Sequence, residues 1–387
     1  MKYALIAYAA VIVLVLTLKP TPQSKGPECG PGVLCIRDQK TVQAELRETP
    51  KPLRPVHTFS IVARDTETGE MGVAVQSHWF SVGSIVTWAE AGVGAVATQS
   101  FVDPSYGKLG LDLMRAGKSA PEALTGLLAG DEGRQVRQVA MIDTQGKVAV
   151  WTGCKDIQAA GDHAGNQIEG GALFGDSGCK SQVHLGTGYS TEANLMSNDK
   201  VWPAMAKAYE STKGDLADRM LAALDAAQAV GGDIRGRQSA ALVIVKAKPS
   251  GKPWEDRIFD LRVDDAVEPL KELRKLVVLQ RAYNHMNAGD LAVEHKDNEA
   301  ALREYATAEK LTEGAAGVDP SRLAEMRYWH AVALVNMGRV DESLPIFQKV
   351  FATPGIGENW RTLTPRLPKS GLLPDDAKLI QRITAAR

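Results

Sequence analysis

The sequence predicts an α+β fold, in which helices pack outside antiparallel sheets, followed by an all-α region. Short β-branched runs alternate with glycine-containing turns after residue 57, and they come mostly in pairs that are typical of β-hairpins. Longer stretches with helical periodicity lie between these pairs. Beyond Val267 the strand pattern stops and only helical patterns continue.

The length of 387 residues indicates two domains, because a single core stops growing well below that size. We divide the chain into a signal peptide or signal anchor (1–19), a Pro-rich tether or propeptide (20–57), an α+β domain (58–267) and an all-α domain (268–387). Hydrophobic residues make up 44% of the chain and charged residues 24%, which is ordinary for packed globular proteins.

The first residues predict export, because the run from Tyr3 to Leu18 carries no charge. This run is slightly shorter than the ~20 residues of a membrane-spanning helix. Lys19 and Pro20 follow it in place of a small-residue cleavage site. A cleaved signal peptide and an uncleaved anchor both remain open. The chain is therefore expected in the periplasm, secreted, or anchored to the membrane by this segment.

The four cysteines fit an oxidising compartment outside the cytoplasm. Cys29 and Cys35 are candidates for a disulfide that closes a small loop, and Cys154 and Cys179 for one that closes a longer loop. Neither pair has neighbours at zinc-ligand spacing, so we predict disulfides in place of a metal site.

Charge and motif content exclude several classes of function. The net charge is −1, from 45 basic and 46 acidic residues, which argues against nucleic acid as a partner and against membrane contact outside the N-terminal segment. The chain contains no H-E-x-x-H, C-x-x-C, G-x-x-x-x-G-K or G-x-S-x-G sequence. No two of its seven histidines stand at helical ligand spacing. We therefore predict neither a cofactor nor a metal site.

The strands and helices of the α+β region can be assigned in order. The predicted strand pairs fall within residues 58–79, 84–99, 136–153 and 237–265. Two long helical patterns cover 109–130 and 199–230.

The C-terminal region shows helical patterns over 269–286, 299–311, 323–338 and 340–352, and a short amphipathic helix over 375–386. Ala331, Gly338, Ser343 and Phe347 have the spacing of a tetratricopeptide repeat, which predicts a tetratricopeptide-like array.

The first hairpin places Thr58 at a chemically useful position. With Thr66–Gly69 as its loop, Asp65 faces Glu70. Each step away from the loop moves one residue along both strands, so Thr58 lies opposite Ser77. A threonine at a chain start can attack with its hydroxyl while its own α-amine acts as base, because that amine has a pKa of about 7.7–8.0. This chemistry requires cleavage of the bond between His57 and Thr58.

Several stretches in order resemble the uncharacterised bacterial family DUF1028. They are HTFSIVARDTETGEMGVAVQSHWFSVGSIVTWAEAGVGAVATQSFVDPSYG, GGDIRGRQSAALVIV and RVDD, and the resemblance spans roughly residues 58–265. That family is grouped with the N-terminal-nucleophile (Ntn) hydrolases, so the resemblance implies a four-layer αββα sandwich of antiparallel sheets. By extension it implies hydrolysis of an amide bond with Thr58 as nucleophile.

Further site residues follow from this resemblance. The strand end that carries the catalytic candidate Gln99 and the candidate substrate-binding residues Thr98 and Ser100 is the candidate source of oxyanion donors, through backbone N–H groups and the Gln99 amide. The loop GGDIRGRQS carries the candidate substrate-binding residues Asp233, Arg235, Gln238 and Ser239. Relative to simpler members of that family, the segment 165–188 resembles an insertion. A Cys154–Cys179 disulfide would hold it as a lid.

Structural alternatives exist for each of these roles. Thr58 is also an ordinary strand-opening residue. Ser77, the candidate catalytic proton relay opposite it, is also a plain hydroxyl at a sheet edge. Gln99 and Ser100 are equally suited to capping the next helix, and Asp233 and Arg235 to bracing a turn. The stretch QSHWFSVGS contains no counterpart of the lysine that assists the threonine of proteasome-type sites.

Two functions from different classes are therefore expected. The first is an exported amidohydrolase or peptidase-like enzyme that acts on an unknown amide-containing substrate after cleavage at His57–Thr58. The second is a catalytically silent scaffold whose helical region binds an envelope protein partner. Assembly into a homo-oligomer is a further expectation.

Overall fold

The computed structural model describes residues 56–176 and 178–386. The predicted signal segment, nearly all of the predicted tether and the pair Cys29 and Cys35 lie outside the described residues. Among the residues that are described, no helix has the length and apolar character needed to span a membrane.

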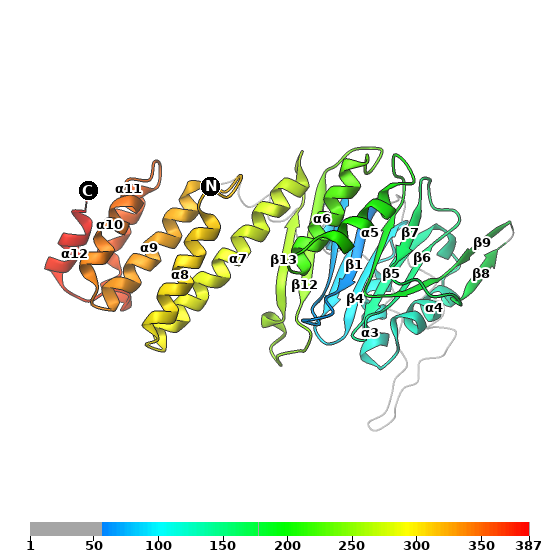
Figure 1. The fold of residues 1–387 in the computed structure, drawn as a ribbon, viewed down its shortest axis with the longest axis horizontal. Helices are drawn as coiled ribbons and strands as arrows, with labels where there is room; N and C mark the ends of the chain where they lie inside the picture. The colour runs from blue at the N-terminus through cyan, green and yellow to red at the C-terminus, as the bar shows by residue number, and fades with distance from the viewer. Residues whose placement is uncertain (1–55, 177, 387) are drawn as a thin grey trace, which may run out of the picture. The chain divides into compact units, whose positions relative to one another are not determined.

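The strands form two larger sheets and one strand pair, and the pairings within them are antiparallel, as predicted from the hairpins (Figure 1). The six-stranded sheet has the order β13 (Arg257–Val263), β12 (Ser239–Val245), β2 (Met71–Ser77), β1 (Thr58–Arg64), β11 (Tyr189–Ala193) and β7 (Gly161–Ala164). The five-stranded sheet has the order β10 (His184–Thr187), β6 (Lys147–Thr152), β5 (Arg137–Asp143), β4 (Gly94–Ser100) and β3 (Thr87–Glu90). The separate pair is β8 (Leu173–Asp176) and β9 (Cys179–Gln182).

Each of the two long helical patterns of this region is divided into two helices. Residues 109–130 are interrupted where Gly117 takes a φ of 91° and Ser119 caps the next helix with a reciprocal capping box. Residues 199–230 are interrupted before Asp215, whose side chain caps the second helix. The resulting helices are α3 (Ser105–Arg115), α4 (Ala120–Gly130), α5 (Val201–Ser211) and α6 (Leu216–Ala229).

Three apolar clusters cover the faces of the two larger sheets. Because side chains alternate along a strand, Ile61 of β1 packs in a cluster with α5 and α6, while Val62 lies in a second cluster. The second cluster joins the two larger sheets, since it also contains Ala97 of β4 and Ala140 of β5. A third cluster packs α3 and α4 against the five-stranded sheet. The region is therefore α+β, with helices outside antiparallel sheets.

The segment 165–188 differs from the predicted lid. Its strand β10 pairs with β6 at the edge of the five-stranded sheet, and only β8 and β9 form a separate hairpin. Cys154 and Cys179 form the predicted disulfide, with their Cα atoms 6.0 Å apart. The disulfide joins the start of β9 to the loop that follows β6.

Between β13 and residue 386 the described elements are all helices, as predicted. They are α7 (Pro269–Glu294), α8 (Asn298–Thr312), α9 (Pro320–Asn336), α10 (Val340–Phe351), α11 (Gly357–Leu363) and α12 (Ala377–Thr384). The sequence did not predict α11, a short helix whose Trp360 packs on Tyr328 with ring centroids 4.6 Å apart. Helix α7 packs against β12, β13 and α6. Its Arg281 forms ion pairs there with Asp215 and Asp218.

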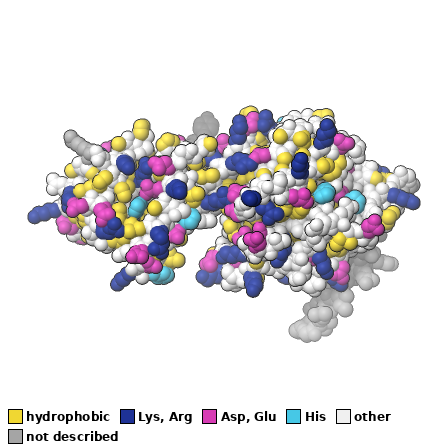
Figure 2. Space-filling model, in the orientation of Figure 1, with side chains coloured by type: hydrophobic (Ala, Val, Ile, Leu, Met, Phe, Trp, Pro, Cys, Tyr) yellow, Lys and Arg dark blue, Asp and Glu magenta, His cyan; other side chains and the backbone are white. Residues whose placement is uncertain are grey.

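Short 3-10 helices complete the described elements: η1 (Val82–Ser84), η2 (Arg134–Val136), η3 (Pro253–Glu255), η4 (Thr364–Arg366) and η5 (Pro368–Ser370). Basic and acidic side chains are interspersed over the face of the molecule shown in Figure 2, and neither sign forms a continuous area on that face.

Candidate functional site

Thr58 is the first residue of β1 and pairs with Ser77, the last residue of β2, in the register that the turn predicted. Its neighbour Phe59 belongs to the cluster with α5 and α6. Because side chains alternate, Thr58 lies on the opposite face of β1, toward the five-stranded sheet. Its side chain is fully buried.

The carbonyl oxygen of His57 accepts two side-chain hydrogen bonds. The Ser77 hydroxyl donates to it at 2.5 Å, and the Nη2 atom of Arg235 donates to it at 2.9 Å. This carbonyl belongs to the peptide bond that joins His57 to Thr58. A hydroxyl and a guanidinium that converge on one carbonyl oxygen would stabilise negative charge on that oxygen. The sequence did not predict this arrangement, since it assigned the oxyanion donors to the end of β4.

Arg235 is held in place by Asp233. The carboxylate accepts the backbone N–H and the Nε atom of Arg235 at 2.9 and 3.1 Å, and the Nη2 atom at 2.7 Å. It also accepts the backbone N–H of His78 at 3.2 Å, which ties the loop to the end of β2. The pair therefore braces its turn and, through the same guanidinium, reaches the His57 carbonyl.

The residues before Thr58 are built into the five-stranded sheet. Val56 forms an antiparallel bridge with Ser100, with N–O distances of 2.5 and 2.9 Å for the two backbone hydrogen bonds. The Val56 carbonyl also accepts the Thr58 hydroxyl at 3.1 Å. Ser100 has a φ of 69°, in the left-handed region that favours glycine, so the backbone turns sharply where it meets Val56.

Gln99, the predicted oxyanion donor, lies beside Thr58 but donates to the Thr58 carbonyl and not to that of His57. Its Nε2 atom donates to the Thr58 carbonyl at 3.3 Å and to the Gln138 Oε1 atom at 2.7 Å. Gln99 therefore fixes the backbone of Thr58 and does not reach the carbonyl of the preceding bond.

A buried carboxyl group completes this part of the site. The Ser60 hydroxyl lies 2.6 Å from Gln99 Oε1 and 2.7 Å from Glu192 Oε1, yet it has one proton to donate. Since the Gln99 oxygen is an acceptor only, the second proton comes from Glu192. Burial raises the pKa of Glu192 well above its ordinary value and keeps the carboxyl protonated.

The protonation of His57 follows from the same network. Asn194 donates through Nδ2 to Gln138 Oε1 at 2.8 Å, so its Oδ1 atom is the acceptor that lies 2.9 Å from His57 Nδ1. The proton of the ring is therefore on Nδ1. Burial and the nearby charge of Arg235 lower the pKa of His57, against the hydrogen bond to Asn194, so the ring is neutral at pH 7.

Asp156 is a buried carboxyl that the sequence did not predict as part of the site. Its Oδ1 atom accepts the Ser100 hydroxyl at 2.7 Å, while its Oδ2 atom has no hydrogen-bond partner among the described residues. Burial raises the pKa of Asp156 to about 7. Its only sequence signal is its place two residues after Cys154, in the loop held by the disulfide.

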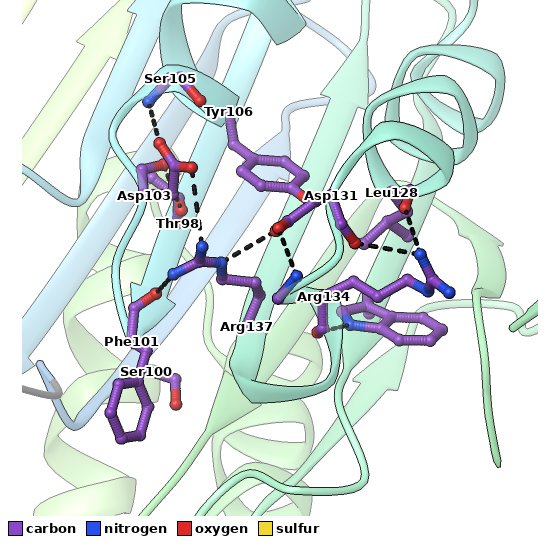
Figure 3. A network of polar contacts seen from close by, with 12 residues as sticks. Thr98, Ser100, Phe101, Asp103, Ser105, Tyr106, Leu128, Asp131, Arg134 and Arg137 are labelled. Atoms are coloured by element: carbon purple, nitrogen blue, oxygen red, sulfur yellow. Dashed lines mark hydrogen bonds and ion pairs between the residues drawn. The ribbon is translucent and has the colours of Figure 1, made fainter. Parts of the chain in front are cut away.

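Arg137 braces the loop that follows Ser100. Figure 3 shows its guanidinium between the Phe101 carbonyl, Asp103 and Asp131. The Asp131 carboxylate accepts Arg137 Nε at 2.9 Å and the Tyr106 hydroxyl at 3.0 Å. Because Arg137 is buried and pairs with Ser100 across β4 and β5, the network fixes the backbone that Val56 contacts.

Three predicted substrate-binding residues do not join this group. Thr98 is adjacent to Gln99 on β4 and therefore lies on the other face, where its hydroxyl donates to the Asp103 carbonyl at 3.1 Å. Ser239 donates to the Trp79 carbonyl at 2.5 Å and so braces the turn after β2. Gln238 donates to Asp265 at 3.1 Å.

No group of three or more His, Cys, Asp or Glu side chains suited to a metal ion occurs within residues 56–176 and 178–386. The groups that meet at Thr58 are instead hydroxyls, amides, a guanidinium and a protonated carboxyl. They are suited to holding a backbone segment and polarising its carbonyl.

Comparison with known proteins gives a family match. The model of the family of unknown function DUF1028 matches residues 58–180 and 169–273, which together make up more than half of the chain. Among solved structures, protein SPO2555 from Silicibacter pomeroyi, which carries the same family model, is 26% identical, with a TM-score of 0.45 over 57% of this chain and 88% of that chain. No curated protein matches the chain.

Proposed function

This chain belongs to the DUF1028 family of unknown function, and from the geometry of its site we propose that it is an Ntn hydrolase that first cleaves its own His57–Thr58 bond and then an amide bond of a substrate. The observation that carries this proposal is the pair of hydrogen bonds from Ser77 and Arg235 to the His57 carbonyl. These donors lie at the oxygen that becomes negative when the neighbouring Thr58 hydroxyl attacks.

The first step is an acyl shift within the chain. The Thr58 Oγ1 atom bonds to the His57 carbonyl carbon, the C–N bond to Thr58 breaks, and the hydroxyl proton ends on the departing nitrogen. Water then hydrolyses the resulting ester, which leaves a carboxylate on His57 and a free hydroxyl and α-amine on Thr58. That amine acts as the base for the same hydroxyl when an external amide is attacked.

The layering of the fold supports the same proposal. One apolar cluster joins the two larger sheets, and two others pack helix pairs on their outer faces, as in an αββα sandwich of the Ntn type. Thr58 begins a strand inside this arrangement and faces the opposing sheet. A nucleophile at this place needs no cofactor.

A catalytically silent scaffold is the second candidate, and the burial of Thr58 favours it. The side chain is fully buried while Val56 is bridged to Ser100, so Thr58 is inaccessible as long as the chain before it stays intact. In this alternative a tetratricopeptide-like region from residue 268 onward binds an envelope protein partner. A silent scaffold has no need of two donors on the His57 carbonyl, so we favour the enzyme.

Export from the cytoplasm is part of the proposal. The uncharged run from Tyr3 to Leu18 is typical of an export signal. The disulfide between Cys154 and Cys179 supports it, because disulfides persist mainly in oxidising compartments. Periplasmic, secreted and anchored forms all agree with these two observations.

The experiment compares the Thr58→Ala and Thr87→Ala variants on a broad panel of amides. Thr87 is a matched control, because it too opens a strand and donates its hydroxyl to a backbone carbonyl, that of Gly83 at 2.8 Å. We expect the rate of amide hydrolysis to fall at least about 1,000-fold in Thr58→Ala and to stay at the wild-type value in Thr87→Ala. Unchanged hydrolysis by Thr58→Ala would assign the activity to another site.

A further inference from the structure

The backbone that precedes Thr58 lies where a bound peptide would lie. Val56 is hydrogen-bonded through both its N–H and its C=O to the backbone of Ser100, as an added β-strand would be. His57 follows with its ring held by Asn194 and its carbonyl held by Ser77 and Arg235. The N–H and C=O of Val56 and the C=O of His57 thus each have a partner.

The side chain of Val56 is enclosed by apolar residues. It is buried and belongs to the cluster that joins the two larger sheets, together with Val82, Val86 and Val102. A charged side chain in this place would lose its hydration without gaining a partner. A small branched aliphatic side chain is therefore the kind that fits.

From these contacts, and resting on the proposed function, we propose that the place of Val56 and His57 is the acyl-side binding site for substrate. After cleavage the segment that ends at His57 leaves, and an external peptide takes its place. The substrate class is then a peptide bound in extended conformation, with a β-branched aliphatic residue second before the scissile bond.

The strand pairing adds a second requirement. The Val56 N–H donates to the Ser100 carbonyl, so the substrate residue in this place needs a free backbone N–H. Because Arg137 holds the Phe101 carbonyl and pairs across the sheet with Ser100, the acceptor is fixed before a peptide arrives. Selectivity for peptide over a simple carboxamide follows from this backbone pairing.

The test uses the full processed protein and three fluorogenic amides of 7-amino-4-methylcoumarin. Their acyl groups are acetyl-Val-His, acetyl-Asp-His and acetyl-(N-methyl-Val)-His. We expect kcat/KM to fall at least about 100-fold from Val to Asp, because a charge would enter the apolar pocket. We expect a roughly 5- to 10-fold fall on N-methylation, because one hydrogen bond to Ser100 is lost.

The outcomes separate this inference from the proposed function. Hydrolysis of all three amides with kcat/KM values within about 3-fold of one another would overturn the inference and leave the Thr58 hydrolase standing. If none of the three is cleaved while other amides are, the acyl site is wrong and the hydrolase again stands. If no amide of any kind is cleaved by a protein that begins at Thr58, the proposed function itself fails.

Discussion

The guanidinium of Arg235 donates a hydrogen bond of 2.9 Å to the carbonyl oxygen of His57, a residue 178 positions away in the sequence. The same guanidinium is fixed by Asp233, so the contact does not depend on a freely moving side chain. Together with the Ser77 hydroxyl, it polarises the bond that must break if Thr58 is to become an N-terminal nucleophile.

Replacing Arg235 by Gln is expected to slow cleavage at His57–Thr58 by roughly 100-fold or more, because one donor to the developing oxyanion is lost. The appearance of the two fragments on a denaturing gel measures the rate. Arg237→Gln is the matched control, since Arg237 pairs with Glu268 and does not reach His57. Equal cleavage rates in the two variants would remove Arg235 from the mechanism. Because Arg235→Gln leaves Asp233 buried without its ion-pair partner, thermal unfolding must show that the variant is folded.

The Ser77→Ala variant is expected to slow the same cleavage by about 10- to 100-fold, since the hydroxyl is the second donor on the His57 carbonyl. Ser239→Ala is the control. The two serines pair with each other across β2 and β12, and each donates to a backbone carbonyl at 2.5 Å. Only the carbonyl bound by Ser77 belongs to the His57–Thr58 bond. A slowing by Ser239→Ala as large as that by Ser77→Ala would indicate a general loss of structure.

Replacing Glu192 by Gln is expected to stabilise the protein at pH 8 but not at pH 4. The pKa of Glu192 is raised in the folded protein, so the folded state holds the proton more tightly than the unfolded state. Stability therefore falls as the pH rises above about 4.3, by up to about 1.4 kcal/mol per pH unit, until the folded pKa is passed. A glutamine donates to Ser60 at every pH and removes this loss.

The measurement for Glu192 is the free energy of unfolding in urea from pH 4 to pH 8. Glu210→Gln is the control, because Glu210 also accepts a hydroxyl, that of Tyr189 at 2.6 Å, but is exposed. Parallel pH profiles for Glu192→Gln and the wild type would show that Glu192 is ionised in the folded protein and would refute the proposed proton arrangement.

The Asp156→Asn variant makes a separate pH prediction. With the pKa of Asp156 raised to about 7, the wild type loses stability as the pH rises from about 4 to about 7, and the loss is constant above that. The asparagine variant lacks this change and is expected to be the more stable protein at pH 8. Thermal unfolding at pH 4, 6 and 8 measures the difference, with the exposed residue in Asp199→Asn as control. A variant that is less stable than the wild type at pH 8 would contradict the account.

Local patterns in the sequence were sufficient for β1 to β6, β12 and β13, for the approximate extents of most helices, and for the register of the first hairpin, but not for β7 to β11 or α11. The tight turn between Asp65 and Glu70 fixes the pairing, so Thr58 had to lie opposite Ser77. The same alternation places the Thr98 side chain on the face of β4 opposite that of Gln99, because adjacent residues of a strand face opposite sides.

The contacts that give the site its chemistry were not predictable in this way. Arg235 and His57 meet because two loops converge. The periodicity of apolar residues along strands and helices does not predict which loops lie close together. The protonated state of Glu192 depends on its complete burial between two sheets. A single Glu in a strand pattern is as compatible with an exposed side chain as with a buried one. Asp156 is likewise buried by tertiary packing, and its neighbour Cys154 gave the only signal near it.

The N-terminus of the mature protein tests the central claim most directly. The full chain is expressed with export intact, recovered from its native compartment, and examined by intact mass and N-terminal sequencing. The account predicts that the wild-type chain begins at Thr58 with a free α-amine. Thr58→Ala protein produced in the same way is expected to remain uncleaved between residues 57 and 58. A mature chain that retains His57 before Thr58 would contradict the self-activated nucleophile and favour the silent scaffold.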